Sequence, residues 1–489
     1  MSASAPTTPN SSGWNFDHSY GRLPAMLHEH LAPTPVREPR MVVFNHALAQ
    51  SLGLNGAALA ERAAIFAGNE LPEGAEPLAQ AYAGHQYGHF TGLGDGRAIL
   101  LGEQITPKGE RYDVQLKGSG PTPFSRRGDG RAALGPMLRE YIISEAIHAL
   151  GIPTTRSLAV VTTGEKVFRQ ESLPGAVLTR IAASHIRVGT FEWAAAHRDQ
   201  DALQALADHT LQRHYPELVG AEAPYLELLG GVMERQARLI AQWQCVGFIH
   251  GVMNTDNVAL SGETIDYGPC AFMDVFDPAT VFSSIDRNGR YAYGNQPQIA
   301  QWNLARLAEA LLPLLHADEK QAVELANAAI ESFKVTFEKH WLAGMRPKLG
   351  LFTVEAEDRA LIESLLGWMK EKKADFTNTF RRLSAATSAP QEDAALVEWH
   401  AQWQERLKCQ PQSADEVRQR MQAHNPVVIP RNHKVEEALD AASARDDLRP
   451  MQSLLEVLGR PFDYTREAPA EYTTPSGVEM GEYQTFCGT

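Results

Sequence analysis

One segment in the middle of the chain carries the side chains that are most suggestive of chemistry. His250 opens the segment, Asp256 and Asn257 close it, and Asp266 follows nine residues later in an Asp-Tyr-Gly triplet. Amide and carboxylate oxygens are the hard ligands that Mg²⁺ or Mn²⁺ takes when it also binds phosphate groups. Asn257 and Asp266 are therefore candidate metal ligands, and the alternative is a polar turn in front of a buried strand.

Three features that precede this segment point to a nucleotide. A glycine-rich turn contains Gly94, Gly96 and Arg97, and glycines let backbone N–H groups approach phosphate oxygens closely. Lys117 ends an expected strand and Glu140 lies in the next expected helix, and a strand lysine paired with a helix glutamate holds nucleotide phosphates in protein kinases. Each feature alone is weak, since an ordinary turn or surface charge explains it, but their order favours a nucleotide site.

One position departs from the kinase pattern. In this order, the segment 250–257 resembles a kinase catalytic loop, and Asp266-Tyr-Gly resembles the metal-binding turn that follows it. Val252 stands where a kinase has its catalytic aspartate, and valine cannot accept a proton from a hydroxyl group. This departure argues against ordinary γ-phosphoryl transfer and leaves Asp256 as the available general base.

Positive charge is concentrated in one part of an acidic chain. The net charge is −14, yet the stretch 97–139 has eight Lys or Arg residues against four Asp or Glu residues. Arg180 and Arg187 follow, and they would share a face if their segment were helical. Guanidinium groups suit phosphate oxygens, so we expect these arginines to meet a nucleoside triphosphate; a solvated basic face is the alternative.

Composition limits the class of protein. The 489 residues are 44% hydrophobic, which is enough for a large core. The acidic net charge argues against a nucleic-acid or anionic-membrane partner. No apolar run is long enough to span a bilayer, the N-terminus has no secretory signal, and four cysteines form no disulfide framework. A cytoplasmic protein is expected.

The expected elements predict an α+β, protein-kinase-like fold of two lobes, with the site between them. Hydrophobic patterns predict a β-rich N-lobe and then a helical C-lobe. The expected strands are 97–102, 111–117, 156–161, 165–170 (joined to 156–161 by a turn at 162–164) and 177–181. The expected helices are 55–67, 134–150, 317–342, 356–371 and 391–408, and a capping box at Ser413 and Glu416 opens one more.

Long motifs resemble the selenoprotein O (SelO) family of protein adenylyltransferase pseudokinases. They are Tyr-Ala-Gly-His-Gln-Tyr-Gly at 82–88, Leu-Gly-Asp-Gly-Arg at 93–97, the segment 115–130, and the segment 250–257 with the triplet at 266–268. The resemblance extends from residue 15 to the C-terminus. It implies an ATP-binding fold in which the α-phosphate faces the acceptor, and transfer of AMP to Ser, Thr or Tyr hydroxyls of proteins with release of pyrophosphate.

The resemblance also implies roles for individual residues. Asp256 would be the base, Asn257 and Asp266 would bind Mg²⁺ or Mn²⁺, and Glu140 would be the ion-pair partner of Lys117. The expected ATP contacts are Gly94, Gly96, Arg97, Lys117, Asp129, Gly130, Arg180 and Arg187. Cys487, third from the C-terminus, is where some family members carry selenocysteine or cysteine, and a regulatory disulfide with Cys270 is one hypothesis; an exposed free cysteine is the alternative.

Three functions remain open at this point. The first is a metal-dependent protein adenylyltransferase, with UTP not excluded as a donor. The second is a conventional protein or small-molecule kinase, which Val252 argues against, and the third is a catalytically inactive ATP-binding scaffold. We expect a monomer divided into a tail (1–13), an N-terminal extension (14–75), an N-lobe (76–175), a C-lobe (176–320) and a helical extension (321–489) with the Cys487 tail.

Overall fold

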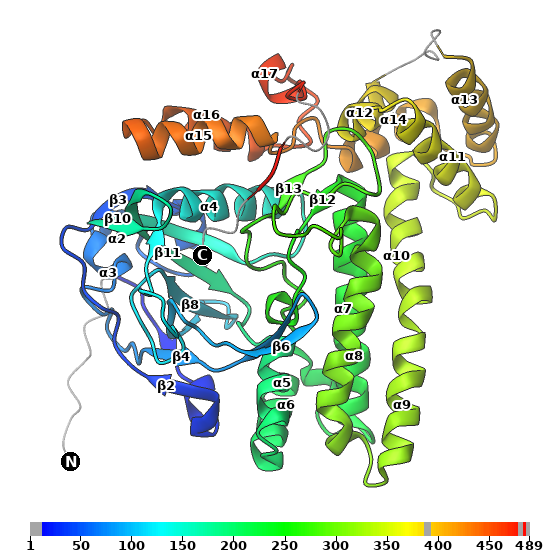
Figure 1. The fold of residues 1–489 in the computed structure, drawn as a ribbon. Coiled ribbons are helices and arrows are strands. Elements are labelled where there is room, and N and C mark those ends of the chain that lie inside the picture. The colour runs from blue at the N-terminus through cyan, green and yellow to red at the C-terminus, as the bar shows by residue number, and fades with distance from the viewer. Residues whose placement is uncertain (1–11, 386–392, 478–482, 486–489) are drawn as a thin grey trace, which may run out of the picture.

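An antiparallel sheet forms one side of the computed structural model, which describes residues 12–385, 393–477 and 483–485 (Figure 1). The main strand order is β2-β4-β7-β8-β11-β10-β3, with β1 paired to β7 and β9 paired to β11. Its strands are β1 Phe16–Asp17, β2 His28–His30, β3 Arg40–Phe44, β4 Leu78–Gln80, β7 Ala98–Ile105, β8 Arg111–Lys117, β9 Ala132–Ala133, β10 Arg156–Phe168 and β11 Ser172–Ala182. Three short helices from the first part of the chain lie beside it: α1 His46–Ser51, α2 Gly56–Leu59 and α3 Ala63–Phe66.

Helix α4 (Leu134–Ala149) packs on β10 and β11, and two helices from the far end of the chain, α15 (Asn432–Arg445) and α16 (Arg449–Leu458), cover it (Figure 1). This position explains why α4 is buried almost all round, including Arg139 and Glu140. A charged residue is buried only where it is paired, so the polar groups of α4 must find partners inside the molecule.

The other side of the molecule is helical (Figure 1). Helix α7 packs against both α8 and α10. The helices here are α5 Val188–Ala196, α6 Gln200–His214, α7 Pro224–Val246, α8 Gln296–Leu315, α9 Glu319–Glu331, α10 Phe333–Lys348, α11 Asp358–Glu371, α12 Phe376–Ala385, α13 Ala394–Leu407, α14 Ala414–His424 and α17 Ala470–Thr473. Two small two-stranded sheets complete the fold: the hairpin of β5 (Ala83–Gln86) with β6 (His89–Gly92), and the pair of β12 (Phe248–Ile249) with β13 (Ala271–Phe272).

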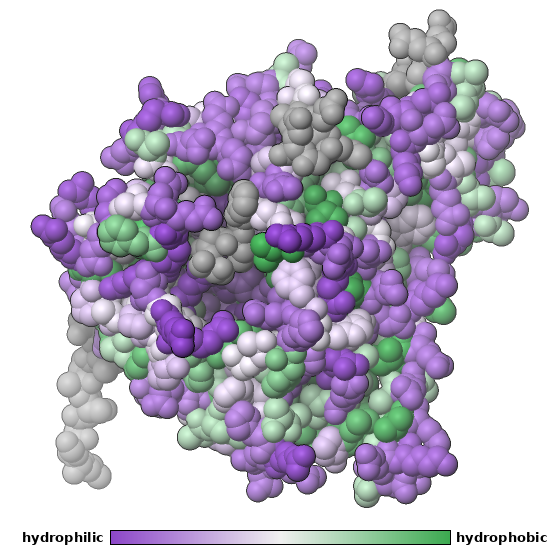
Figure 2. Space-filling model, viewed as in Figure 1, coloured by the Kyte–Doolittle hydropathy of each residue, from purple (hydrophilic) through white to green (hydrophobic). Residues whose placement is uncertain are grey.

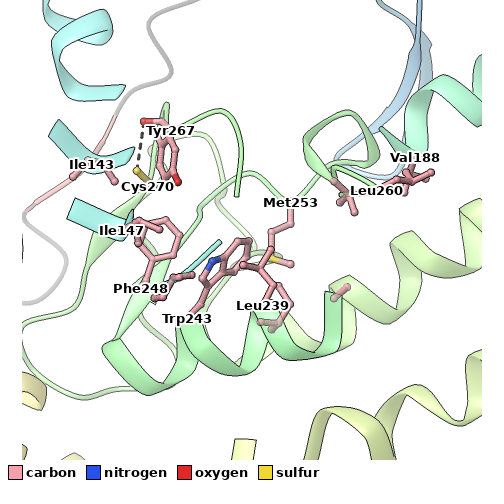
Figure 3. Packing of buried hydrophobic residues seen from close by; sticks show 14 of the residues in the cluster. Ile143, Ile147, Val188, Leu239, Trp243, Phe248, Met253, Leu260, Tyr267 and Cys270 are labelled. Carbon is pink, nitrogen blue, oxygen red and sulfur yellow. Dashed lines mark hydrogen bonds between the residues drawn. The ribbon is translucent and has the colours of Figure 1, made fainter. Parts of the chain in front are cut away.

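A hydrophobic core supports the segment 250–268 from below (Figure 3). Trp243 on α7 stacks on the ring of His250 at 5.4 Å, and its Nε1 donates to Thr264 Oγ1 at 3.0 Å. His250 is fully buried, and one of its ring nitrogens, Nε2, lies 2.8 Å from the carbonyl oxygen of Ile265. The polar loop is therefore held on packed aromatic side chains, which restricts the positions that Asp256 and Asp266 can take.

The α+β arrangement with a β-rich part and a helical part is confirmed. The helix predicted at 134–150 is α4, and the capping box of Ser413 and Glu416 opens α14. Three predictions were wrong in detail. The strands 156–161 and 165–170 form one strand, β10, with a bulge where a turn was expected; the helix 55–67 is two short helices; and the helix 317–342 is α9 and α10 with a break at Ser332.

The division into five segments stays a prediction, and its first segment lies almost wholly outside the described residues. Strands β1, β2 and β3, from the expected extension 14–75, pair within the main sheet. Within the described residues, no helix combines the length and the apolar character that crossing a bilayer requires. The face shown in Figure 2 is largely hydrophilic and is hollowed between the sheet and the helices.

Candidate functional site

A cleft of about 870 Å³ contains every residue that the sequence nominated for the site. Strands β7, β8 and β11, helix α4 and the loop 250–269 provide its walls. The nominated residues on its lining are Gly94, Gly96, Arg97, Lys117, Asp129, Gly130, Glu140, Arg180, Arg187, Asp256, Asn257 and Asp266. Residues that are up to 172 positions apart in the sequence thus share one cavity.

The predicted Lys117–Glu140 pair is present at the centre of the cleft. Lys117 Nζ lies 2.7 Å from Glu140 Oε2 and 2.7 Å from Asp266 Oδ1. Arg180 on β11 donates from Nε to Glu140 Oε1 at 2.8 Å and from Nη2 to Asp266 Oδ1 at 2.6 Å. Burial opposes ionisation of both carboxyls, but Arg180 and Lys117 lower the pKa of Glu140 and hold the pKa of Asp266 well below its usual range.

Arg187 completes a group of three cations around Asp266. Its Nη1 donates to Asp266 Oδ2 at 2.9 Å and to the backbone oxygen of Asp256 at 2.8 Å, and its guanidinium lies 4.5 Å from the ring centre of Tyr82. The shared helical face considered for Arg180 and Arg187 does not exist, because Arg180 is in β11 and Arg187 precedes α5. The two side chains meet on Asp266 instead.

Asp256 has a different environment, although it lies in the same cleft. It is 8% exposed, and its Oδ1 has no hydrogen-bond partner among the described residues. Burial raises the pKa of Asp256 to about 7. Gly84 packs directly against it, since a Cβ on Gly84 would lie 2.3 Å from Asp256 Oδ1. A carboxyl group held in this way can take up a proton near neutral pH.

The candidate metal ligands Asn257 and Asp266 lie on the cleft wall, and both carboxylate oxygens of Asp266 accept from cationic side chains. Asn257 uses its amide nitrogen within the loop, donating to the backbone oxygen of Val252 at 3.0 Å. Asp266 has a positive φ of 64°, an uncommon conformation for a residue with a side chain. One amide oxygen and one ionised carboxylate suit a magnesium or manganese ion that takes its other ligands from phosphates and water. The residues therefore fit such an ion.

The expected glycines are required by a close approach of the chain to itself. Gly94 has a φ of 106°, and a Cβ there would lie 2.4 Å from the ring of Phe124. Gly130 has a φ of 67°, and a Cβ there would lie 2.1 Å from the backbone of Gly120. The absent side chains thus bring the loop 121–130 over the start of β7, and this loop forms part of the cleft wall.

Comparison with known proteins identifies the family. The model of the family described as "Protein adenylyltransferase SelO" matches residues 13–459. The chain belongs to the SelO family. Curated relatives include proteins named "Protein nucleotidyltransferase YdiU" from Brevibacillus brevis, 63% identical over 98% of both chains, and from Bacillus cytotoxicus, 60% identical over 99% of both chains. The predicted family is confirmed, and the chain is a protein nucleotidyltransferase.

A likeness to a solved structure adds nothing to this identification. The structure, entitled "ROP2 from Toxoplasma gondii: A virulence factor with a protein- kinase fold and no enzymatic activity", is 12% identical, and the match covers 68% of this chain and 88% of the other. Its TM-score is 0.24, which is too low to support an argument.

The basic stretch of this SelO-family chain is only partly a feature of the cleft. Arg97, Lys117, Arg126, Arg131 and Arg139 line it, whereas Lys108, Arg111 and Arg127 are not among its lining residues. Arg111 instead pairs with Asp17 and Glu103 at 2.6 Å. The nominated Asp129 pairs with Arg169 at 2.9 Å, and this arginine also lines the cleft.

Sequence reasoning missed several cleft residues. Asp95 is 2% exposed, burial raises its pKa to about 6, and it accepts a hydrogen bond from Gln115 Nε2 at 3.2 Å. Asp95 lies between Gly94 and Gly96, and this position in the glycine-rich turn could have identified it as a cleft residue. Tyr483 and Thr485 line the cleft from the other end of the chain, and no local pattern marks them.

The cysteine hypothesis is not tested by the structure, because Cys487 lies outside the described residues. Cys270 is fully buried, and burial raises the pKa of its thiol to about 12. Its Sγ donates to the backbone oxygen of Tyr267 at 3.4 Å (Figure 3). Thr485 Oγ1 donates to the backbone oxygen of the neighbouring Pro269 at 2.7 Å. A disulfide between Cys270 and Cys487 stays a prediction.

Proposed function

We propose that this enzyme transfers AMP from ATP to Ser, Thr or Tyr hydroxyls of protein substrates and releases pyrophosphate. The observation that supports this best is the state of Asp256, a buried carboxyl with a pKa of about 7 and an unpartnered oxygen, on the wall of a cation-rich cleft. Val252 provides no carboxylate at the position where a kinase has its base. Asp256 is then the proton acceptor for the incoming hydroxyl.

The proposed step balances as a substitution at the α-phosphorus of ATP. The acceptor oxygen forms a bond to that phosphorus, the bond from the α-phosphorus to the α,β-bridging oxygen breaks, and pyrophosphate leaves with the bonding electrons. The proton of the acceptor hydroxyl passes to the carboxylate of Asp256, which lines the cleft. General-base assistance of this kind contributes about 10²- to 10⁴-fold in rate.

The other cleft residues are assigned to binding. Lys117, Arg180 and Arg187 are proposed to orient the phosphates, because they are already gathered within 3 Å of Asp266. Arg97, Asp129 and the backbone at the glycines 94, 96 and 130 are proposed to complete the nucleotide site. Asn257 and Asp266 would hold Mg²⁺ or Mn²⁺, which supplies charge neutralisation for the phosphates when bound.

Two labelled nucleotides test this proposal. The protein is incubated with α-labelled ATP or with γ-labelled ATP, in the presence of Mg²⁺ or Mn²⁺ and a cell extract. Label that enters protein from the α-position alone is the expected result. Label from the γ-position alone would indicate a kinase, and no label from either position would favour an inactive scaffold. Label from α-labelled UTP in preference to ATP would change the assigned donor.

A further inference from the structure

A second cavity, of about 620 Å³, lies beside the segment 250–257, which is called the catalytic segment below because it carries the proposed base Asp256. Its lining comes from the loop 285–290, from the start of α8 including Trp302, and from Tyr87 in the turn of the β5–β6 hairpin. None of the residues nominated for nucleotide or metal binding lines this cavity. The nucleotide cleft therefore does not account for it.

The cavity is joined to the catalytic segment by direct contacts. Asn254 lies on the wall of the cleft, two residues before Asp256. Its Oδ1 accepts hydrogen bonds from the backbone N–H of Tyr87 at 3.1 Å and from the hydroxyl of Tyr291 at 2.5 Å. Gln86 lines the cleft, and the next residue, Tyr87, lines the second cavity. The wall of the cavity is thus joined through Asn254 to the loop that carries Asp256.

Two guanidinium groups give this cavity positive charge. Arg287 is exposed, and Arg290 lies with its guanidinium 4.8 Å from the ring centre of Trp302. Within the described part of the chain, Nε and Nη2 of Arg290 are buried without a hydrogen-bond acceptor. Buried donors left without partners cost free energy, so Arg290 would gain from an incoming acceptor.

The one acidic residue on the lining does not neutralise these arginines. Asp286 is 6% exposed, and its carboxylate is occupied by the backbone. Its Oδ1 accepts from the N–H of Arg290 at 2.9 Å, and its Oδ2 accepts from the N–H of Tyr291 at 2.8 Å. The hydrogen bonds of Asp286 therefore hold the backbone of the loop, and its carboxylate accepts from backbone N–H groups in place of the two guanidinium groups.

Exposed apolar side chains border the same cavity. Ile285 on its lining is 59% exposed, and Phe90 on β6 is 51% exposed. The ring of Phe90 lies 5.4 Å from the ring of His85, which in turn lies 5.4 Å from that of Trp302. Arginine and aromatic residues are enriched where proteins bind other proteins, and a surface of this extent suits a polypeptide better than a small anion.

We propose that this cavity is the acceptor subsite of the enzyme, and that it binds a protein segment with an acidic side chain close to the modified hydroxyl. The acidic side chain pairs with Arg290 and Arg287, and an apolar neighbour of that side chain packs on Ile285. The inference rests on the proposed function, since it supplies the substrate class for Asp256. The inference adds that the enzyme prefers protein substrates with acidic residues around the modified hydroxyl.

Peptide binding tests the subsite without requiring AMP transfer. A fluorescent peptide with a central tyrosine between aspartates is compared with a counterpart that has lysines at the same positions. Fluorescence anisotropy is measured with the full chain, after the nucleotide cleft has been saturated with a non-hydrolysable ATP analogue. We expect the aspartate peptide to bind at least about tenfold more tightly, and we expect this preference to weaken as salt is added.

Charge reversal locates the binding. The double variant R287E/R290E should lose about tenfold or more in affinity for the aspartate peptide. The single variant R287E, at an exposed position, should lose part of it even if the double variant folds poorly. R449E is the matched control, because Arg449 is also exposed and does not line the cavity. Unchanged thermal melting and retained ATP binding show that a variant is intact.

Several results would overturn the inference. Equal affinity for both peptides, or wild-type affinity in a folded R287E/R290E variant, would remove Arg287 and Arg290 from acceptor binding, and wild-type affinity in R287E would remove Arg287. Displacement of the aspartate peptide by inorganic phosphate or AMP at equal concentration would identify a small-anion site instead. If the peptide binds as expected but receives no label from α-labelled ATP, the proposed AMP transfer fails while the subsite stands.

Discussion

At the scale of single residues, two aspartates of one cleft have pKa values that are shifted in opposite directions. Asp266 accepts from Lys117, Arg180 and Arg187, which keep its pKa well below its usual range. Arg187 also reaches Asp256, but it donates to the backbone oxygen and leaves the side chain unpaired. Burial then dominates and raises the pKa of Asp256 to about 7. The two residues are thus suited to different tasks, one to fixed charge and one to proton transfer.

Asp256→Asn should separate proton transfer from nucleotide binding. The amide has the shape of the carboxyl but cannot accept the proton, so we expect label transfer from α-labelled ATP to fall by about 100-fold or more. ATP binding, measured by calorimetry or by thermal shift, should change little, because Lys117, Arg180 and Arg187 are paired with Asp266 and not with the Asp256 carboxyl. Full transfer activity in this variant would exclude Asp256 as the base.

At the scale of elements, the β5–β6 hairpin positions the candidate base. Gly84 in β5 has room for nothing larger, because its missing Cβ leaves space for Asp256 Oδ1. The backbone N–H of His85 donates to Thr255 Oγ1 at 2.7 Å, and Thr255 in turn donates to Glu192 Oε2 on α5 at 2.6 Å. The hairpin, the loop and α5 are therefore joined by hydrogen bonds next to Asp256.

Gly84→Ala and Gly92→Ala form a matched pair on this hairpin. A Cβ at Gly84 would overlap Asp256 Oδ1, whereas a Cβ at Gly92 would make ordinary contact with Trp193 at 3.5 Å. We expect Gly84→Ala to displace Asp256 and to lower label transfer by about 100-fold, as small displacements of catalytic groups do. Gly92→Ala should keep transfer within about twofold of wild type. Equal rates in the two variants would contradict a positioning role for Gly84.

The elements that were predicted correctly have strong local signals. The apolar residues of helix α4 recur at helical spacing, and Gly151, with a φ of 76°, follows its end. The predicted helix 134–150 therefore differs from the observed helix, Leu134–Ala149, by one residue at its end. The site was predictable because Lys117, Glu140 and Asp266 keep the order expected of a kinase-like chain. The continuity of β10 could not be predicted, because the local sequence at 162–166 is typical of a turn. The strand continues through a bulge there only because it pairs with β11. The place of Thr485 on the cleft wall could not be predicted either, because it depends on pairing with Ser283 in a distant loop.

At the scale of the whole molecule, one core contains a charge that opposes folding. Lys348 ends α10 and is 2% exposed, with its ammonium group 4.3 Å from the ring centre of Phe380 and 5.7 Å from that of Phe376. Burial lowers the pKa of Lys348 to about 8. The protonated form is therefore more favourable in the unfolded chain than in the folded one, and this difference reduces stability at neutral pH.

Lys348→Met should stabilise the protein at pH 7 by about 1 to 3 kcal/mol, because the apolar side chain fills the same space without a buried charge. The size of this gain depends on pH. Below pH 8 the wild-type lysine is charged in both states and the full cost applies; the cost falls as the pH rises from 8 toward the ordinary lysine pKa of 10.5, so most of it is gone at pH 10. Urea unfolding at pH 7 and at pH 10 measures the difference. A gain that is equal at both values would contradict the charge explanation.

The far end of the chain has a practical consequence for work on this enzyme. Thr485 pairs with Ser283, its N–H donates to the backbone oxygen of Phe282 at 2.8 Å, and Tyr483 lines the nucleotide cleft beside Arg139. An affinity tag or reporter fused after residue 489 would therefore be attached four residues beyond Thr485, which lines the cleft and pairs with Ser283. Fusions at the N-terminal end leave these contacts intact, and kinetic constants measured on the two kinds of construction should not be pooled.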